Sequence, residues 1–536
     1  MFYKKLRFLY LVFLSHFFFF SSFAQRRANV WYFGFKAGID FNASLPVAIE
    51  SSMITGEGCA SISDQDGKLL FYTDGSTVWD TSQTQMPNGI GLKGGSSSGQ
   101  SALIVPKPGN SSIYYIFTTS DMLTSFCYSI VDMTKNGGMG DVDVATKNIT
   151  LLDSVTEKLT AVHHANMTDI WVVTHEWNTD AFYAYLVTNS GIQSPVISNV
   201  GTVHKNNMIT NWNSIGYMKA SPDGKKLGLA IRDMNLFEVF DFDNLTGKVS
   251  GAISLPSPDQ TVYGVEFSPD GTKFYGTAMT SSTLGPGKLF QYNLQAGSAV
   301  AIKNSVVSIP VTLAVRGIQL APDCRIYVVG SSQNIGVIAN PNLSGVSCNY
   351  SDNGFTLKSG TSASLGLPAF IQSYFGQSGL FKITLGNDTS ICEGDTIKLT
   401  PDNKGSSCIW SNGSTASSLS VTSPGSYWIK VSGSCGADVD TINVNNKDCS
   451  ATVKLSPPNI ITPNNDGIND VFFVGMILND WELLVYNRWG RLIYSAIEYK
   501  NDWNALGLPD GVYYYLLTNS KKSSSVYNGY VQVIHN

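Results

Sequence analysis

The side chains best suited to binding a transition metal gather around one predicted hairpin. They are His163, His164, His175 and Glu176, in the segment HHANMTDIWVVTHE. His164 and His175 lie eleven residues apart, and the H-E-x-x-H pattern that places two histidines on one helix face is absent from the sequence. Neighbouring residues of a strand point to opposite faces, so His163 diverges from His164, and His175 from Glu176. We therefore expect structural polar positions rather than a metal site.

A cluster of oxygen-bearing side chains lies nearer the C-terminus. It comprises Asn464, Asn465, Asp466, Asn469 and Asp470, and oxygen ligands at alternating positions suit a calcium ion. The cluster lacks the D-x-[DN]-x-[DN]-G register and the distal Glu of a calcium loop. Asx side chains also cap turns of their own backbone, which explains the cluster equally well. Two interpretations follow: turn capping, or calcium held by Asp466, Asn469 and Asp470. No other cofactor is expected.

Motifs for nucleophilic catalysis and for phosphate binding are absent from the sequence. It contains no G-x-S-x-G elbow and no G-x-x-x-x-G-K-[ST] loop. The GGSSSG stretch at Gly94–Gly99 is typical of a flexible loop. Asp64, Asp66 and Asp74 have the spacing of turn residues. No catalytic residue is predicted, and the sequence favours a protein that is not an enzyme.

The eight cysteines fall into two groups. Four are scattered through the first two-thirds of the chain and are expected to be small buried apolar residues: Cys59, Cys127, Cys324 and Cys348. The other four lie within 58 positions and are expected to staple a small domain: Cys392, Cys408, Cys435 and Cys449. No pair has the C-x-x-C spacing of a zinc or redox site.

The first 24 residues have the three parts of a secretory signal peptide. Lys4, Lys5 and Arg7 precede an apolar run at Phe8–Phe20, and small residues lead to a cleavage point after Ala24. The run is shorter than the ~20 residues of a spanning helix. No later segment is apolar enough to span a membrane. The mature chain is therefore expected to pass through the periplasm, to have no transmembrane segment, and to be able to form disulfides.

Composition favours short strands over long helices. Charged residues make up only 14% of the 536 residues, and the balance is rich in turn formers such as glycine. The net charge of −5 provides no cationic field for a phosphate backbone, so nucleic acid is not an expected partner.

A strand–turn–strand pattern repeats between residues 28 and 375. The clearest copies are Tyr217–Ile231, Val265–Ala278 and Ile318–Val329, with turns that start at Pro222, Pro269 and Pro322 and are 47 and 53 residues apart. Weaker copies surround Asp66-Gly67, Pro108-Gly109 and Thr168-Asp169. Proline presets φ in such turns, and aspartate hydrogen-bonds its own backbone.

Repeats of this period predict an all-β ring. Thin antiparallel sheets bury both faces only when they stack, and ~40–50 residues per repeat is typical of propeller blades. Six repeats are visible. We expect a seventh blade formed by ring closure, with Leu367–Tyr374 as its inner strand and Val30–Phe33 and Gly38–Phe41 as outer strands, and six blades as the alternative.

The turns SPDGKKL, SPDGTKFYG and LAPDCRIYV resemble those of WD-repeat-like β-propellers. The closing LPAFIQSYF is similar to the end of propellers in exported surface proteins of gliding bacteria. This resemblance implies a propeller over residues 25–376.

Residues 382–448 resemble the PKD-like or immunoglobulin-like modules of bacterial surface proteins. Alternating segments such as CIWSNGSTASSLSV and SYWIKVSG carry the resemblance, which implies a β-sandwich with Trp410 in its core. On this basis a disulfide between Cys392 and Cys435 would cross-link the sandwich, and Cys408 with Cys449 is the next candidate pair.

Residues 455–536 closely resemble the gliding motility-associated C-terminal domain, the sorting signal of one class of type IX secretion cargo. The match includes NIITPNNDGINDVFFV, YNRWGRLIY and LPDGVYYYLL, and its motif residues are Thr462, Pro463, Asn464, Asp466, Gly467, Asn487, Arg488, Trp489, Gly490, Asp510, Gly511 and Tyr513. The alternation within these segments predicts a compact C-terminal β-sandwich. The resemblance implies recognition by the type IX secretion machinery and passage across the outer membrane.

The sequence thus predicts a secreted or cell-surface binding or structural protein. Its propeller would present a recognition surface for a glycan or a protein. The alternative is a secreted propeller hydrolase acting on polysaccharide or peptide, with carboxylates contributed by separate blades.

Overall fold

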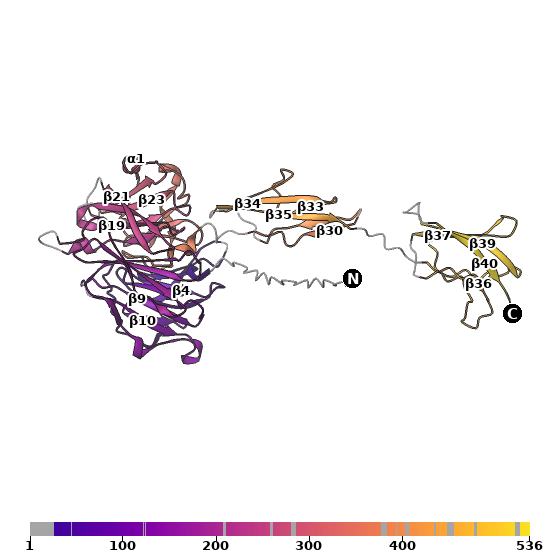
Figure 1. The fold of residues 1–536 in the computed structure, drawn as a ribbon, viewed down its shortest axis with the longest axis horizontal. Coiled ribbons are helices and arrows are strands. Elements are labelled where there is room, and N and C mark those ends of the chain that lie inside the picture. The colour runs from indigo at the N-terminus through magenta and orange to yellow at the C-terminus, as the bar shows by residue number, and fades with distance from the viewer. Residues whose placement is uncertain are drawn as a thin grey trace, which may run out of the picture. The chain divides into compact units, whose positions relative to one another are not determined.

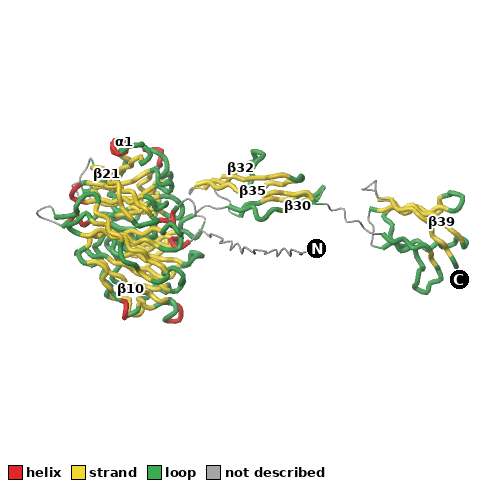
Figure 2. Tube along the Cα trace, viewed as in Figure 1, coloured by secondary structure: helices red, strands yellow, loops and turns green. Residues whose placement is uncertain are grey.

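The computed structural model describes residues 26–43, 45–121, 123, 125–206, 211–257, 261–279, 286–376, 383–392, 394–402, 407–433, 436–447, 455–475, 480–519 and 526–535. The expected signal peptide lies outside these residues. Strands dominate each part of the chain, as Figures 1 and 2 show. Within the described ranges, no helix has the length and hydrophobicity of a membrane-spanning segment.

Seven antiparallel sheets occupy the described residues between 26 and 376. The first three comprise β1 (Val30–Phe33), β2 (Phe35–Asp40) and β3 (Val47–Ile54); β4 (Ala60–Ser63), β5 (Leu69–Thr73), β6 (Thr77–Asp80) and β7 (Gln85–Ile90); and β8 (Ala102–Pro106), β9 (Ile113–Thr118), β10 (Phe126–Asp132), β11 (Asp141–Val142) and β12 (Ile149–Leu152). The fourth comprises β13 (Val155–His163), β14 (Ile170–Glu176), β15 (Ala181–Thr188), β16 (Gly191–Ile192) and β17 (Val196–Asn199).

The remaining three sheets have four strands each. They comprise β18 (Met218–Ala220), β19 (Lys226–Ile231), β20 (Leu236–Asp243) and β21 (Lys248–Pro256); β22 (Val262–Phe267), β23 (Lys273–Ala278), β24 (Lys288–Asn293) and β25 (Val307–Ile309); and β26 (Ile318–Leu320), β27 (Ile326–Val328), β28 (Asn334–Ile338) and β29 (Tyr350–Thr356). Short helices connect them: η1 (Arg26–Ala28), η2 (Asn136–Gly138), η3 (Val144–Thr146), η4 (Trp212–Ser214), η5 (Arg232–Met234), α1 (Ala299–Asn304), η6 (Gly345–Cys348) and η7 (Gln372–Phe375).

The Pro-Asp turns predicted from the sequence join the first two strands of three sheets. In the turn after β18, Asp223 Oδ1 accepts hydrogen bonds from Ser221 Oγ at 2.6 Å and from the Lys225 amide at 3.1 Å. Asp270 repeats this arrangement after β22. Gly224 has a φ of +71°, which a side chain would make unfavourable. Local turn chemistry therefore sets where each hairpin reverses.

The seven sheets form a closed ring around their first strands. These inner strands contact one another in sequence from β1 through β4, β8, β13, β18 and β22 to β26. The ring closes where Tyr327 of β27 packs on Trp31 of β1 at 5.7 Å and on Phe41 at 5.5 Å, measured between ring centroids. The fold is therefore a seven-bladed β-propeller, the larger of the two blade numbers expected.

The segment Leu367–Tyr374 does not form the inner strand of a blade, although the sequence predicted that it would. The first blade is built wholly from β1, β2 and β3, and Leu367–Tyr374 is not its inner strand. The amide of Leu365 donates to the Gly56 carbonyl at 2.9 Å, just before β4 begins, whereas the His163 amide at the end of β13 donates to Ser373 Oγ at 3.0 Å. Residues 362–376, here called the plug, therefore run through the centre of the ring from one end of the inner strands to the other.

The plug has this path because its side chains fill the ring's centre. Phe370 and Ile371 are buried, and the Phe370 ring packs on Trp31 at 5.6 Å. Only isolated bridges link the plug to the inner strands, at Cys59 with Pro368 and at Ala161 with Ile371. Proline at 368 has no amide hydrogen to donate to a regular ladder.

The middle module has two sheets among its described residues. A four-stranded sheet has the order β30-β35-β34-β32, and β31 pairs with β33. The strands are β30 (Thr389–Ile391), β31 (Ile397–Leu399), β32 (Ser407–Trp410), β33 (Leu419–Val421), β34 (Gly425–Gly433) and β35 (Gly436–Asn446). Trp410 is fully buried, and its Nε1 donates to the Ala416 carbonyl at 2.8 Å, so its predicted place in the core is confirmed.

The C-terminal module contains a five-stranded sheet in the order β36-β40-β39-β37-β38. Its strands are β36 (Ile460–Ile461), β37 (Trp481–Tyr486), β38 (Leu492–Ile497), β39 (Gly511–Asn519) and β40 (Val526–Val533). Loop residues Phe472, Tyr499 and Trp503 complete its core. The Asn487 side chain accepts from the Trp489 and Arg491 amides, so this motif residue shapes the turn between β37 and β38.

Replacing Phe370 by alanine tests the role of the plug. Because the ring is buried against Trp31, Phe370→Ala should lower the free energy of unfolding of the propeller by about 3–5 kcal/mol. Calorimetry of the mature chain should show this as a lower midpoint for the propeller transition. Phe35→Ala is the matched control, since Phe35 is 46% exposed, and it should change the midpoint little. Equal effects of the two substitutions would contradict a plug that stabilises the ring.

Candidate functional site

Charged and aromatic side chains converge at the end of the ring where the inner strands begin, here called the mouth. Glu57 precedes β4, and Arg316 precedes β26. Glu157 and Tyr263 lie near the starts of β13 and β22. Loops between second and third strands reach the same end and contribute two more residues. Together they form the mouth cluster: Glu57, Asp121, Glu157, Arg232, Tyr263 and Arg316.

The plug forms the floor beneath this cluster. The Gly317 amide donates to the Leu365 carbonyl at 2.9 Å, and the Leu367 amide donates to the Tyr217 hydroxyl at 3.2 Å. A Cβ at Gly366 would lie 2.2 Å from the Glu57 carbonyl oxygen, so the plug is packed directly against the start of the second blade. The plug therefore closes the ring beneath the mouth cluster, and the region above the plug is here called the basin.

Two carboxyl groups lie in the basin, of which Glu157 is buried and Glu57 is half-buried. Glu157 is 1% exposed, and its Oε2 accepts a hydrogen bond from the Gly99 amide at 2.7 Å. Burial raises the pKa of Glu157 to about 8, although the Gly99 amide favours the charged form. Burial likewise raises the pKa of Glu57 to about 7, against the opposing effects of Tyr263 and Arg232. Both carboxyl groups therefore hold a proton near neutral pH far more than an exposed glutamate does.

Several polar atoms of the cluster make no hydrogen bond with a described residue. They include Glu57 Oε2, the Tyr263 hydroxyl and Arg232 Nε, all shielded from solvent. Buried polar groups are almost always hydrogen-bonded, and an unsatisfied one costs about 1–3 kcal/mol. Glu57 and Tyr263 interact with each other, so Arg232 Nε is the atom of this group that a ligand could satisfy.

An arginine–tryptophan pair forms one rim of the mouth. The Arg232 guanidinium carbon lies 4.5 Å from the centre of the Trp212 ring, a cation–π geometry. Trp212 is 45% exposed. Its helix η4 packs against η5, which carries Arg232, and the Asp233 amide donates to Asn213 Oδ1 at 3.2 Å. The tryptophan ring is thus held at the surface.

Positive charge extends below the rim. Lys158 is buried, and its ammonium group donates to the Ser214 and Ile215 carbonyls at 2.9 and 3.2 Å. Burial lowers the pKa of Lys158 to about 7, while Glu157 opposes that shift. Burial also lowers the pKa of Arg316, with Tyr263 raising it and Arg232 lowering it.

Deeper in the ring, Lys219, Glu266 and Gln319 join three neighbouring inner strands. Lys219 donates to Gln319 Oε1 and lies 3.8 Å from Glu266, which also accepts from the Leu320 amide at 2.9 Å. Burial lowers the pKa of Lys219 and raises the pKa of Glu266. This group is fully enclosed and acts as a polar link between blades.

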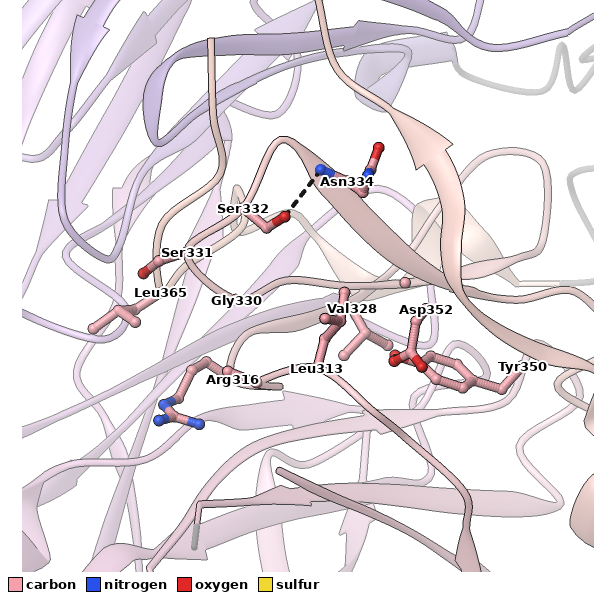
Figure 3. Close-up of a pocket in the computed structure, with 12 residues that line it drawn as sticks. Leu313, Arg316, Val328, Gly330, Ser331, Ser332, Asn334, Tyr350, Asp352 and Leu365 are labelled. Carbon is pink, nitrogen blue, oxygen red and sulfur yellow. Dashed lines mark hydrogen bonds between the residues drawn. The ribbon is translucent and has the colours of Figure 1, made fainter. Parts of the chain in front are cut away.

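A cavity of about 260 Å³ adjoins the mouth in the last blade. Arg316 and Leu365 line it on the side of the mouth, and its polar lining residues include Ser332, Asn334, Tyr350 and Asp352 (Figure 3). The Tyr350 hydroxyl donates to Asp352 Oδ1 at 3.0 Å. Hydroxyl, amide and carboxylate groups next to an aromatic ring suit a small polyhydroxylated ligand.

The histidines singled out in the sequence do not come together. His163 Nδ1 lies 2.6 Å from Ser373 Oγ in the plug, and His164 Nε2 lies 3.0 Å from the Leu245 carbonyl. His175, near the other end of this blade, stacks on His204 with 3.8 Å between centroids. No group of three or more metal-binding side chains gathers among the described residues.

The Asx cluster of the C-terminal module caps its own turn. The Asp470 carboxylate accepts from the Asn464, Asn465 and Gly467 amides at 2.7–3.0 Å, and Asp466 Oδ1 accepts from the Ile468 amide at 2.8 Å. These bonds favour the turn-capping interpretation over calcium at Asp466, Asn469 and Asp470.

The cysteines agree in part with expectation. Cys59, Cys127 and Cys348 are buried free thiols, whereas Cys324 is buried but disulfide-bonded, which the sequence did not predict. The proposed bond between Cys408 and Cys449 is wrong, because Cys408 is a free thiol whose Sγ lies 3.1 Å from the Ala416 carbonyl oxygen. Cys435 lies outside the described residues, so its pairing with Cys392 stays a prediction.

The mouth cluster was missed by sequence reasoning. Its members span positions 57 to 316 and belong to no motif. One signal was available: Glu57, Glu157, Tyr263 and Arg316 stand at or just before the start of a repeat's first strand. Inner strands of a propeller begin at one end of the ring, so the position within the repeat predicts that such residues meet.

Comparison with known proteins identifies the C-terminal module. Residues 455–533 match the family described as the CHU_C Type IX secretion signal domain. This protein is therefore a type IX secretion cargo, carried across the outer membrane to the cell surface or beyond, with a propeller as its largest part. The signal implies contact with the type IX secretion machinery. No curated protein matches the chain.

Solved structures similar to the chain are distant. Hydrazine synthase of Kuenenia stuttgartiensis is 14% identical, with 52% of this chain and 72% of that chain covered and a TM-score of 0.34. A putative 6-phosphogluconolactonase of Bacteroides fragilis is 9% identical, with coverages of 64% and 98% and a TM-score of 0.38. The periplasmic gluconolactonase of Pseudomonas aeruginosa is 12% identical, with coverages of 69% and 97% and a TM-score of 0.33.

The raised pKa of Glu157 predicts how stability depends on pH. The folded chain holds this proton up to about pH 8, whereas an unfolded glutamate releases it near 4.5, so stability falls as the pH rises through that window. Glu157→Gln removes this loss and should gain up to about 2 kcal/mol relative to the parent between pH 5 and pH 7. Urea unfolding at both pH values measures the difference.

The control for this experiment is Glu50→Gln. Glu50 is an exposed residue of β3 whose side chain is 45% accessible. Its substitution should leave the pH dependence of unfolding unchanged. A Glu157→Gln variant that follows the parent at both pH values would show that Glu157 is ionised in the folded chain.

Proposed function

We propose that this exported protein is a surface or secreted recognition protein that binds a glycan at the propeller mouth without turning it over. One observation supports this most: six charged or aromatic side chains from separate blades converge on a basin whose floor is sealed by the plug. Propeller sites gather their side chains in this way, because every inner strand starts at the same end.

Both described ends of the propeller lie at the end of the ring opposite the mouth. The Arg26 amide donates to the Gln65 carbonyl in the turn after β4, at the end of the ring opposite the mouth. A Cβ at Gly376 would lie 3.0 Å from the Pro222 carbonyl oxygen, in the turn after β18 at that same end. The first and last described residues of the propeller therefore both lie away from the basin.

The chemistry of the rim favours a sugar. Exposed aromatic rings stack on the apolar faces of sugar rings, and Trp212 offers such a ring beside the hydrogen-bond donors of Arg232. The polar lining of the adjoining cavity adds further donors and acceptors for hydroxyl groups. A mixed aromatic and polar surface of this kind accounts for the choice of glycan over protein.

A polysaccharide hydrolase is the second candidate, and the two glutamates of the basin favour it. Glu57 and Glu157 interact electrostatically and have pKa values raised to about 7 and about 8. Glycoside hydrolysis uses a pair of carboxyl groups, of which one must stay protonated near neutral pH.

Trp212→Ala tests glycan binding. Loss of the stacking surface should weaken binding of any glycan identified on an array by about tenfold in titration calorimetry. Trp489→Ala is a matched control, because Trp489 is also exposed and also lies under an arginine, with 4.3 Å between Arg488 and the ring. Equal binding by the parent and by Trp212→Ala would contradict a site at this rim.

The same preparations separate binding from catalysis. The parent chain should leave labelled polysaccharides intact. Turnover that disappears in both Glu57→Gln and Glu157→Gln would establish the hydrolase in place of the binding protein.

Removing residues 455–536 tests the export signal. Without the sorting domain, the chain should accumulate in the periplasm, because the signal peptide alone directs passage across the inner membrane only. Cell fractionation and surface labelling measure the distribution. A chain that lacks residues 382–448 but keeps the sorting domain should still reach the surface. Surface display of the chain without residues 455–536 would count against the assignment.

A further inference from the structure

Two guanidinium groups give the mouth a positive character. Arg232 makes no ion pair within 4.0 Å among the described residues. Burial lowers the pKa of Arg316, and the nearby charge of Arg232 adds to this effect, whereas Tyr263 opposes it. The carboxyl groups that could neutralise them are Glu57, Glu157 and Asp121. Desolvation raises the pKa of Glu157 to about 8 and that of Glu57 to about 7, so neither carries a full negative charge near neutral pH. An anionic group in the basin would therefore be attracted.

The neighbouring cavity has a different character. Its polar groups are the carboxylate of Asp352, the hydroxyls of Tyr350 and Ser332, and the amide of Asn334. The Ser332 hydroxyl accepts from the backbone amide of Asn334 at 3.1 Å, which holds the Ser332 side chain at this wall (Figure 3). The side-chain Oδ1 of Asn334 accepts from the Thr356 hydroxyl at 2.9 Å. At about 260 Å³ the cavity is smaller than the ~300–1,000 Å³ of drug-sized sites, which suits a single sugar ring.

Arg316 connects the two regions. It lines the cavity, and it also interacts electrostatically with Tyr263 and Arg232 in the mouth cluster. Its Nη1 donates to the Val315 carbonyl at 2.9 Å, and the side chain is only 5% exposed, so its position is fixed. A Cβ at Gly336 would lie 2.4 Å from the Tyr350 hydroxyl, so glycine at 336 keeps that ring in the cavity wall.

We propose that the mouth and the cavity together bind an acidic saccharide, with the carboxylate of a uronate residue at Arg232 and Arg316 and the hydroxyls of the adjacent sugar at Asn334 and Asp352. This rests on the proposed glycan-binding function and names the class of glycan. Arginine is suited to the task, because its planar guanidinium pairs with a carboxylate through two parallel hydrogen bonds.

The carboxyl groups of the basin add a pH dependence. A bound carboxylate repels ionised Glu57 and Glu157 and therefore favours their protonated forms. For the same reason, the ligand binds more tightly when these two side chains are protonated. Asp121, Lys158 and Tyr263 also face this region. Binding should therefore weaken as the pH rises from 6 to 9, while binding of a neutral saccharide should change less.

Titration calorimetry of the mature chain with two oligosaccharides of equal length tests the proposal. The probes are tetragalacturonate and galactotetraose, which differ in the carboxylate at C6. Tetragalacturonate should bind at least about tenfold more tightly, because a charge-assisted pair at arginine is added. Arg232→Gln should remove most of this preference, and Arg232→Lys should retain part of it.

Two further variants locate the site. Arg488→Gln is the matched control, since Arg488 also lies over an exposed tryptophan, and it should leave both affinities unchanged. Asn334→Ala should weaken both saccharides by a similar factor, because it acts through the cavity. Far-ultraviolet spectra of each variant verify the fold.

The outcomes are distinguishable. Equal binding of the acidic and neutral probes would overturn the inference and leave the proposed function standing. A preference for tetragalacturonate that survives Arg232→Gln would place the acidic group elsewhere and would also overturn it. If neither probe binds and an array of other glycans is negative as well, the proposed glycan-binding function itself fails.

Discussion

The propeller depends on filling the centre of its ring. Seven thin sheets bury their inner strands only if something occupies the space those strands surround, and here the chain supplies it from its own C-terminal side. The plug contributes the buried side chains of Phe370 and Ile371. It is hydrogen-bonded to Gly56 at one end of the ring and, through Ser373, to His163 at the other. Because one segment contacts several blades at once, the residues that fill the centre also link the blades to one another.

Sealing the ring also creates the candidate site. With the channel filled below, the charged residues at the mouth are packed above the plug. Burial raises the pKa of Glu57 and Glu157 and leaves Arg232 Nε without a hydrogen-bond partner among the described residues. These features cost stability in the isolated protein. A ligand that supplies the missing hydrogen bonds would recover part of that cost, which is the reason for assigning recognition to this end.

Export is encoded separately from recognition. The sorting signal is a folded module with its own core around Phe472, Tyr499 and Trp503, and its turns are shaped by local Asx bonds such as those of Asp470 and Asn487. None of these residues takes part in the propeller. Secretion and ligand binding can therefore be altered independently by substitution.

The sequence alone determined those features of the fold that depend on residues close together along the chain. The Pro-Asp turns at Asp223 and Asp270, the buried Trp410 and the sorting module all follow from local turn chemistry, strand alternation or a contiguous motif. The path of the plug and the mouth cluster were decided only by tertiary structure, as was the free thiol of Cys408. The physical reason is separation along the chain: Glu57 and Arg316 lie 259 positions apart, and no local preference brings them together. They meet because every blade starts its inner strand at the same end of a closed ring.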